Sequence, residues 1–501
     1  MEGFRGRPMV TEACARLRFF RVAFARFRSN ARKSQPVFKA NLGPSRRAPA
    51  RPHTLISSPA AGNADPAVEQ ATLGRVSRRL IPFLFVLYVV SFLDRVNVGF
   101  ASLEMNRDLG LSPADYGFGA GVFFIGYALF EVPSNLILAR MGARIWIARI
   151  MITWGLIAAA MMFVRGPSSF YVLRFLLGVA EAGFFPGIVF YLSQWFPSEA
   201  RARAIAKFMT AIPISGAIGG PVSGALMGLN GVLGLAGWQW LFLFEGLPAV
   251  LLGVAVLACL PDRVEDAVWL ESEQREWLTR QLAAERVRCV EHHGASVARA
   301  LANPVVWLLG LLGFFSISFG QYTLSLWLPQ IVRGFAGLSN LQVGFVSAIP
   351  NLAAVVGMVL VASHSDRTGE RCRHVAAASS AAVAGFVGSA LATSPAVAVL
   401  FLSLAVTGVL SAHGPFWPLP SKFLTGSAAA GGIALINSLA NLSSFVGPWA
   451  IGLLNHFSGS FRSGLLVLAA VPLAGMALAM GLRRAAALRT TPATSSLTSA
   501  P

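Results

Sequence analysis

The most constraining feature of this chain is a series of apolar stretches that recur between residues 80 and 482. About 20 residues of α-helix cross the ~30 Å hydrocarbon core of a bilayer, and each stretch is long enough to do so. We count twelve stretches, at 80–101, 118–139, 146–164, 170–194, 208–228, 240–260, 304–328, 342–363, 375–393, 396–419, 429–454 and 464–482. The strands of an outer-membrane barrel would instead alternate over about ten residues. The sequence therefore predicts an all-α membrane protein with twelve transmembrane helices.

The composition excludes several other classes of protein. Of the 501 residues, 55% are hydrophobic and only 13% are charged, whereas soluble domains carry about 25% charged residues. This argues against a soluble enzyme and against a mainly disordered chain. The formal net charge of +19 could suggest nucleic acid, but much of it lies in the N-terminal segment and in short loops. The four cysteines have no metal-ligand spacing, so we expect no metal, cofactor or disulfide framework.

Changes in polarity divide the chain into five expected parts. They are an arginine-rich, disordered N-terminal extension at 1–79, a six-helix bundle at 80–260, a cytoplasmic linker at 261–303, a second six-helix bundle at 304–482 and a disordered tail at 483–501. The extension also fits a targeting segment or a mis-assigned start. Within the linker, residues 269–287 have the pattern of an amphipathic helix that lies on the membrane face.

Basic residues lie mainly in alternate loops, and this bias predicts the orientation. Cytoplasmic loops are enriched in Lys and Arg. The loops on the linker side carry Arg140, Arg144, Arg149, Arg201, Arg203, Lys207, Arg367, Arg371, Arg373 and Lys422, and the opposite loops carry Arg107, Arg165, Arg333 and Arg462. We therefore expect both termini to be cytoplasmic, in a protein of the inner (plasma) membrane.

The two halves of the chain repeat one another at a shift of 227 residues. Three landmarks share this register: Arg140-x-Gly142-x-Arg144 with Arg367-x-Gly369-x-Arg371, Gly220-Pro221 with Gly447-Pro448, and Asp94-Arg95 with Gln321-Tyr322. This register indicates two six-helix bundles related as parallel repeats. Transporters built in this way bind their substrate near the bilayer midplane, between the halves.

Four ionisable residues lie inside predicted spans: Asp94 and Arg95 in the first, and Arg174 and Glu181 in the fourth. Each costs about 2.5–3.5 kcal/mol at a helix centre on insertion scales, so each needs a partner or a water-filled cavity. The seven-residue spacing places Arg174 and Glu181 on one helix face. We interpret Arg95 and Arg174 as ligands of a small organic anion, and Asp94 and Glu181 as proton carriers.

A purely structural alternative is that the four charges form two salt bridges that lock the first and fourth spans together. Apolar packing would serve that purpose at lower cost, which favours a binding site. Glu131 and Glu245 are expected to pair with loop arginines and hold a gate. No phosphate-binding GxxxxGK[ST] motif is present, so ATP-driven pumping is not expected.

Longer motifs resemble the major facilitator superfamily, and within it the anion:cation symporter family. They are FLDRVNVGFA at 92–101, EVPSNLILARMGAR at 131–144, RFLLGVAEAGFFPG at 174–187, WFPSEARARA at 195–204, GWQWLFLFEGLPA at 237–249, SHSDRTGERCRH at 363–374 and ALINSLANLSSFVGP at 434–448. The 237–249 motif and the linker look especially like bacterial tartrate, phthalate and sugar-acid permeases.

The resemblance implies a monomeric transporter that takes up an organic anion with protons by alternating access, without enzymatic activity. Onto this sequence it carries the roles of substrate ligands (Arg95, Arg174, Tyr127, Gln321, Trp417 and Asn437), proton-coupling residues (Asp94 and Glu181) and gating residues (Arg140, Gly142, Arg144, Asp366, Arg367, Gly369 and Arg371). One departure is Ala139, which replaces the usual Asp before Arg140. This predicts a weaker or differently paired first gate. Sodium or phosphate coupling and the export of drugs or cations remain alternatives, although intramembrane arginines disfavour a cationic cargo.

Overall fold

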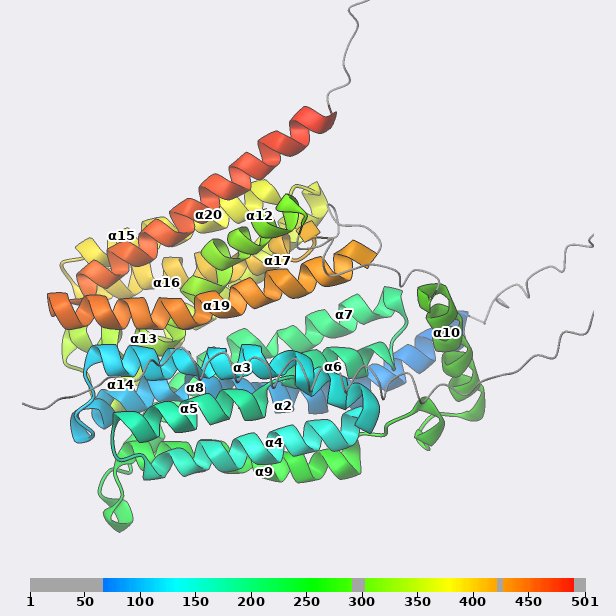
Figure 1. Ribbon diagram of the computed structural model, residues 1–501, viewed down its shortest axis with the longest axis horizontal. Helices are drawn as coiled ribbons and strands as arrows, with labels where there is room; N and C mark the ends of the chain where they lie inside the picture. Colours follow the sequence, from blue (N-terminus) through cyan, green and yellow to red (C-terminus); the bar gives the residue numbers. More distant parts are fainter. Residues whose placement is uncertain (1–65, 291–301, 421–426, 491–501) are drawn as a thin grey trace, which may run out of the picture. The chain divides into compact units, whose positions relative to one another are not determined.

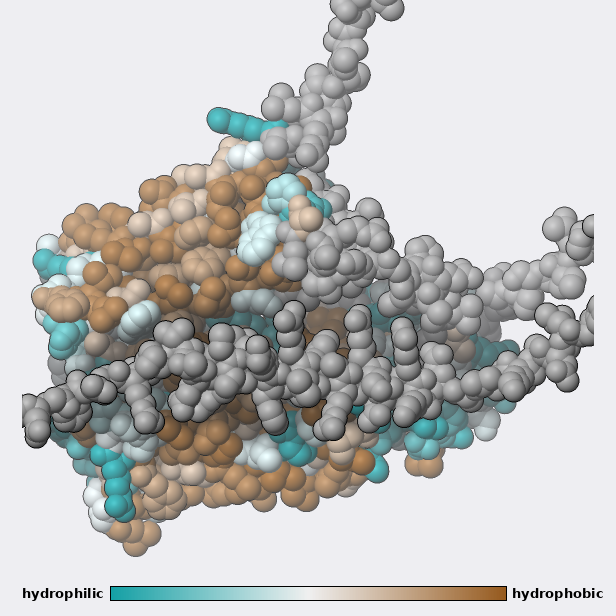
Figure 2. All heavy atoms as spheres, viewed as in Figure 1, coloured by the Kyte–Doolittle hydropathy of each residue, from teal (hydrophilic) through white to brown (hydrophobic). Residues whose placement is uncertain are grey.

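The computed structural model describes residues 66–290, 302–420 and 427–490, and this part of the chain is helical without strands (Figure 1). Eleven helical segments within it are long and apolar enough to cross a membrane. The helix α19 (Ser427–Ser458) adds the remaining predicted span. On the face drawn in Figure 2, hydrophobic residues cover the lengths of the helices and hydrophilic residues gather mainly toward their ends. The predicted class of fold, a twelve-helix membrane protein, is confirmed.

The first half of the chain forms six spans. They are α2 (Pro66–Asp108), α3 (Pro113–Met141), α4 (Ala143–Ala160) continued by η1 (Met161–Phe163), α5 (Pro167–Glu181) with α6 (Phe184–Ser193), α7 (Ser198–Met209) with α8 (Ala211–Met227), and α9 (Gly237–Cys259). The short helices η2 (Val232–Gly234) and η3 (Val264–Asp266) lie in connections, and α10 (Ser272–Val290) follows.

The second half forms the other six spans. They are α12 (Pro304–Gly313) with η4 (Phe314–Ser318) and α13 (Phe319–Ala336), α14 (Asn340–Thr368), α15 (Cys372–Leu391), α16 (Pro395–Ser411) with α17 (His413–Phe416), α19, and α20 (Phe461–Thr490). Helix therefore continues to Thr490, eight residues into the expected tail.

The first helix also begins earlier than expected. Residues 66–79 were assigned to the N-terminal extension on composition, but they form the first turns of α2. Their polarity reflects contacts with other polar groups rather than disorder. Arg75 forms an ion pair with Glu271 at 2.7 Å and donates to Gln274 at 3.1 Å. Residues 1–65 lie outside the described residues.

Two spans, the fourth and the seventh, are not regular α-helix along their whole length. The fourth span breaks after Glu181, because Ala182 has an extended ψ and Gly183 has a φ of +86°. A side chain at Gly183 would also lie 2.4 Å from the Ser134 hydroxyl, so only glycine fits. In the seventh span, η4 is a π-helical turn. Such turns occur frequently at functional sites.

The repeat is visible in how the two halves pack. Helix α3 lies against α19, and α8 lies against α14. At Gly117 an added Cβ would lie 2.5 Å from the carbonyl oxygen of Pro448, and at Gly344 it would lie 2.3 Å from that of Gly220. Gly117 and Gly344 are 227 residues apart, so the two crossings are equivalent by the repeat. Close backbone approach at small residues is typical of packed membrane helices.

The linker helix α10 packs against the first half of the chain. Leu278 is buried. Just before α10, the Trp269 ring stacks on Trp195, with the ring centroids 5.8 Å apart. Arg201 of α7 forms an ion pair with Glu285 of α10 at 2.8 Å. The apolar side of the helix is thus covered by the first half of the chain.

Candidate functional site

A buried ion pair lies between the first and fourth spans. The guanidinium of Arg95 on α2 pairs with the carboxylate of Glu181, the last residue of α5. The Ser91 hydroxyl donates to the same carboxylate oxygen, Oε1, at 2.8 Å. All three residues are buried. The break at Gly183 ends α5 directly beyond Glu181 and fixes where this carboxylate lies.

Aromatic rings surround Arg95 on its other sides. Its Nη1 donates to the Tyr322 hydroxyl at 2.9 Å, and α13 contributes this tyrosine from the other half of the chain. The guanidinium carbon lies 5.3 Å from the ring centroid of Tyr127 and 5.5 Å from that of Phe123. Arg95 and Tyr322 are 227 residues apart, so repeat-equivalent residues meet where the two halves face each other.

The second intramembrane arginine faces a different group. Arg174 is buried, and its Nη2 donates to the carbonyl oxygen of Ala120 on α3 at 3.0 Å. Its guanidinium carbon lies 5.0 Å from the centroid of the Phe123 ring, so this ring contacts both arginines. The Nε atoms of Arg95 and Arg174 are buried and lack a hydrogen-bond partner. Two guanidinium groups with spare donors beside one ring could bind an anion.

Asp94 lies apart from this cluster. Its Oδ2 accepts from the indole nitrogen of Trp154 on α4 at 2.7 Å, and its Oδ1 accepts from Asn97 at 3.4 Å. Successive helical residues point about 100° apart, and Asp94 accordingly faces the interior of the first half, while Arg95 faces Glu181. The structure therefore brings Arg95, Glu181 and Tyr127 together and leaves Asp94 in a separate polar site.

The other predicted ligands are distributed around the cluster. Asn437 on α19 donates to Glu131 of α3 at 3.1 Å, and Asn441 donates to the same carboxylate at 3.3 Å. The expectation that Glu131 pairs with a loop arginine is therefore wrong, because its partners come from the facing bundle. Trp417 is 42% exposed, and the described contact of its ring is with Phe416 at 5.4 Å between centroids.

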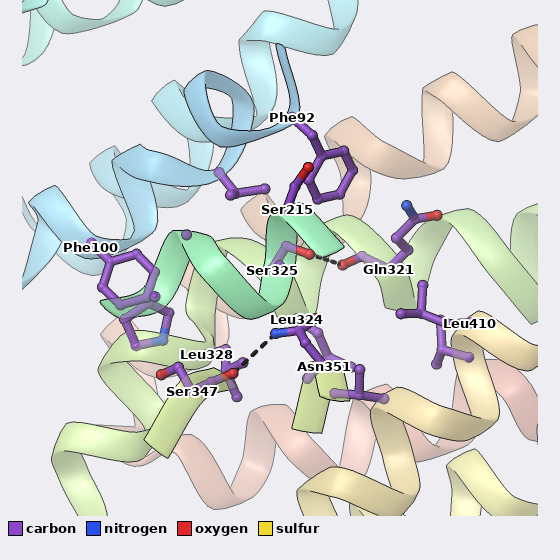
Figure 3. Close-up of a pocket in the computed structure, with 17 residues that line it drawn as sticks. Phe92, Phe100, Ser215, Gln321, Leu324, Ser325, Leu328, Ser347, Asn351 and Leu410 are labelled. Atoms are coloured by element: carbon purple, nitrogen blue, oxygen red, sulfur yellow. Dashed lines mark hydrogen bonds between the residues drawn. The ribbon is translucent and has the colours of Figure 1, made fainter. Parts of the chain in front are cut away.

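Gln321 lines a small cavity between the two halves (Figure 3). The wall comprises residues of α2, α8, α13, α14 and α16, among them Phe92, Ser215, Gln321, Ser347, Asn351 and Leu410. The cavity volume is about 40 Å³. A few water molecules fit in such a space, but an organic acid does not.

The residues predicted to gate lie at the ends of α3 and α14. Asp262, beyond α9, accepts from the backbone N–H of Arg144 at 3.0 Å and pairs with its guanidinium at 3.4 Å. In the second half, Asp366 pairs with Arg371 at 2.6 Å. Gly142 and Gly369 both have a positive φ. The first loop therefore pairs differently from the second, as Ala139 suggested, with Asp262 supplying the acid. Arg140 and Arg367 are exposed.

Three residues that contact the Arg95–Glu181 pair were not predicted from the sequence, namely Ser91, Phe123 and Tyr322. Ser91 precedes Arg95 by four residues and so shares its helix face. Tyr322 is the repeat equivalent of Arg95, and this register was a signal that could have assigned it. Nothing in the local sequence distinguishes Phe123 from other phenylalanines. Within the described residues no group of three His, Cys, Asp or Glu side chains could hold a metal ion.

Comparisons with known proteins agree with this architecture. The family model described as Major Facilitator Superfamily matches residues 84–448. A protein of Agrobacterium vitis named "Putative tartrate transporter" is 52% identical over 83% of this chain and 92% of its own length. The "Quinolone resistance transporter" of Acinetobacter baumannii is 43% identical over 82% and 94%. Among solved structures, the xylose transporter XylE of Escherichia coli matches with a TM-score of 0.64 at 16% identity, over 82% and 98%.

Proposed function

The chain belongs to the Major Facilitator Superfamily and is a multi-span membrane transporter rather than an enzyme, and from this premise we propose that it takes up a small organic anion together with protons. The Arg95–Glu181 pair carries this proposal. A buried arginine whose counter-ion is itself a protonatable carboxylate can exchange that carboxylate for one on a substrate. We place the protein in the inner membrane as a monomer, with both termini in the cytoplasm.

The nature of the site supports an anionic cargo. Two buried arginines share the Phe123 ring, and each keeps a free Nε donor. Planar guanidinium groups bind carboxylates through paired donors. The Agrobacterium vitis relative is named for tartrate, which favours a dicarboxylate or sugar acid among organic anions. Drug export is a second candidate, because the Acinetobacter baumannii relative is named for quinolone resistance.

Exchange of carboxylates at Arg95 would couple anion and proton. When a substrate carboxylate engages Arg95, Glu181 loses its cation. Breaking a buried pair in this way costs about 3–5 kcal/mol unless the stranded charge is neutralised. Glu181 would therefore take up a proton as the anion binds, and by linkage a bound proton would favour the anion equally. The neutralised site could then close and reopen on the other side of the membrane.

Uptake into proteoliposomes tests this function. With an alkaline interior, we expect the parent protein to accumulate radiolabelled L-tartrate or, failing that, a sugar acid or aromatic acid. Glu181→Gln should exchange labelled for unlabelled anion but lose accumulation driven by the pH gradient. Glu273→Gln, at an exposed position on α10, is the matched control and should behave like the parent. If Glu181→Gln accumulates the anion as the parent does, the assigned proton role is wrong.

A further inference from the structure

Glu245, the second acid expected to hold a gate, does not lie at the gating loops. It lies inside α9, where its Oε1 accepts from the Ser223 hydroxyl of α8 at 2.8 Å. The expectation that Glu245 pairs with a loop arginine is therefore wrong. Where Asp366 and Arg371 pair in the second half, the structure instead shows two histidines in contact, to which the proposed function gives no role.

The two histidines meet across the connection between α14 and α15. His364 lies near the end of α14, and His374 lies in the first turn of α15. The Nδ1 atom of His364 and the Nε2 atom of His374 are 2.7 Å apart, and the ring centroids are 5.0 Å apart. His364 is exposed and His374 is half-buried. Two imidazole nitrogens that face each other are therefore within reach of solvent.

A backbone group determines which nitrogen of His374 carries the hydrogen. The Nδ1 atom of His374 bonds the carbonyl oxygen of Glu370, four residues earlier. A carbonyl oxygen only accepts, so Nδ1 carries the hydrogen and the neutral ring has its lone pair on Nε2, the atom that faces His364. Histidines that bind metal ions commonly donate their other ring N–H to a backbone carbonyl or a carboxylate. His374 is thus already oriented as a metal ligand.

The acids of this connection are engaged by arginines. Asp366 pairs with Arg371 at 2.6 Å. Glu370 pairs with Arg373 at 3.6 Å and with Arg483 of α20 at 3.3 Å. Neither carboxylate is available as a further metal ligand, in agreement with the lack of any three-residue metal group among the described residues. A cation bound here would have two protein ligands, both of them neutral imidazole nitrogens.

We propose that His364 and His374 bind one late first-row divalent ion, such as Zn²⁺, Ni²⁺ or Cu²⁺, between Nδ1 of His364 and Nε2 of His374, with water as the remaining ligands. Imidazole nitrogen suits these ions, whereas Mg²⁺ and Ca²⁺ prefer oxygen. The hydrogen on Nδ1 of His364 passes through solvent to the other nitrogen of the same ring.

The geometry of the pair is close to that of a bound ion. Two Zn–N bonds of about 2.0–2.1 Å at a tetrahedral angle place the nitrogens about 3.3 Å apart. The rings therefore need to separate by about 0.6 Å from their present distance, and the exposed ring of His364 permits this shift. The bound ion would tie the end of α14 to the start of α15, across the residues predicted to gate.

Zinc binding to the purified, tag-free full chain tests this site, whatever the protein transports. The parent, His364→Gln, His374→Gln and the double variant are titrated with ZnCl₂ in competition with a zinc-binding dye. We expect the parent to bind one Zn²⁺ more than the double variant. Each single variant should weaken this ion at least about tenfold, because loss of even an outer partner of a ligand costs about 10–100-fold. His456→Gln, an exposed histidine near the end of α19, is the matched control and should bind as the parent does.

Thermal unfolding gives a second readout, because an ion that binds only the folded chain raises its Tm. ZnCl₂ should raise the Tm of the parent and of His456→Gln but not that of His364→Gln, and MgCl₂ should raise none of them. If His364→Gln does not fold, His374→Gln decides. Equal Zn²⁺ affinity in the parent and both single variants would overturn the site. A loss confined to one variant would overturn it too, because the ion would then bind a single histidine.

Discussion

At the scale of the residue, the bond between Arg95 and Tyr322 joins the two halves of the chain. Tyr322→Phe would leave Nη1 of Arg95 without this acceptor whenever no cargo is bound, at a cost of about 1–3 kcal/mol. When cargo is bound, the substrate carboxylate would still accept hydrogen bonds from Arg95. We therefore expect net uptake, which needs the empty carrier to return, to slow several-fold, while exchange of labelled for unlabelled anion is retained.

The matched control for this variant is Tyr171→Phe. The Tyr171 hydroxyl donates to Asp115 at 2.7 Å, and both residues belong to the first half of the chain. Its loss should leave the ratio of exchange to net uptake unchanged. Equal slowing of both processes in Tyr322→Phe would show that the tyrosine contacts the cargo or supports the fold, and would refute a role in the empty state.

The sequence predicted the important charges but not their partners. Buried charge is scarce in a membrane helix, so Asp94, Arg95, Arg174 and Glu181 could be selected from the sequence. Which of them meet depends on helix rotation and on the break at Gly183, which no local pattern specified. The different directions of Asp94 and Arg95 follow from helix geometry alone and could have been foreseen.

At the scale of the element, the crossing of α8 and α14 depends on backbone contact between Gly220 and Gly344. An added methyl at Gly220 would lie 2.3 Å from the carbonyl oxygen of Gly344. Overpacking of this kind costs about 1–3 kcal/mol. We expect Gly220→Ala to lower the apparent Tm of the purified protein by several degrees.

Gly74 on α2 is the control for this substitution, because a Cβ there meets nothing within 4 Å. Alanine exceeds glycine in helix propensity by about 1 kcal/mol, so Gly74→Ala should hold or raise the Tm. Equal shifts in the two variants would mean that the α8–α14 contact does not determine stability.

Helices were more predictable than their interruptions. Hydropathy identified every span because a bilayer requires about 20 apolar residues. The ends of α2 and α20 were missed because polar residues outside the apolar run continue the helix. The π-helical turn at 314–318 reads as ordinary apolar sequence, and only tertiary packing determines its extra residue per turn.

At the scale of the whole molecule, the two ends of the helices differ in charge. Arg144 pairs with Asp262, between α9 and α10, and Arg201 pairs with Glu285 of α10. Figure 1 shows the connection between α8 and α9 at the opposite end of the helices from α10. The positive-inside rule assigns the α10 end to the cytoplasm. Orientation matters for the proposed function because it determines which mouth of the site faces the external anion.

Two exposed positions test this orientation. Val268, which precedes α10, is 89% exposed, and Leu233 in η2, between α8 and α9, is 84% exposed. Single cysteines at these positions, in a chain whose four native cysteines are replaced by serine or alanine, would be treated with a membrane-impermeant maleimide. We expect Leu233→Cys to be labelled on intact spheroplasts and Val268→Cys only after permeabilisation. The reverse pattern would turn the protein over in the membrane and refute the orientation proposed here.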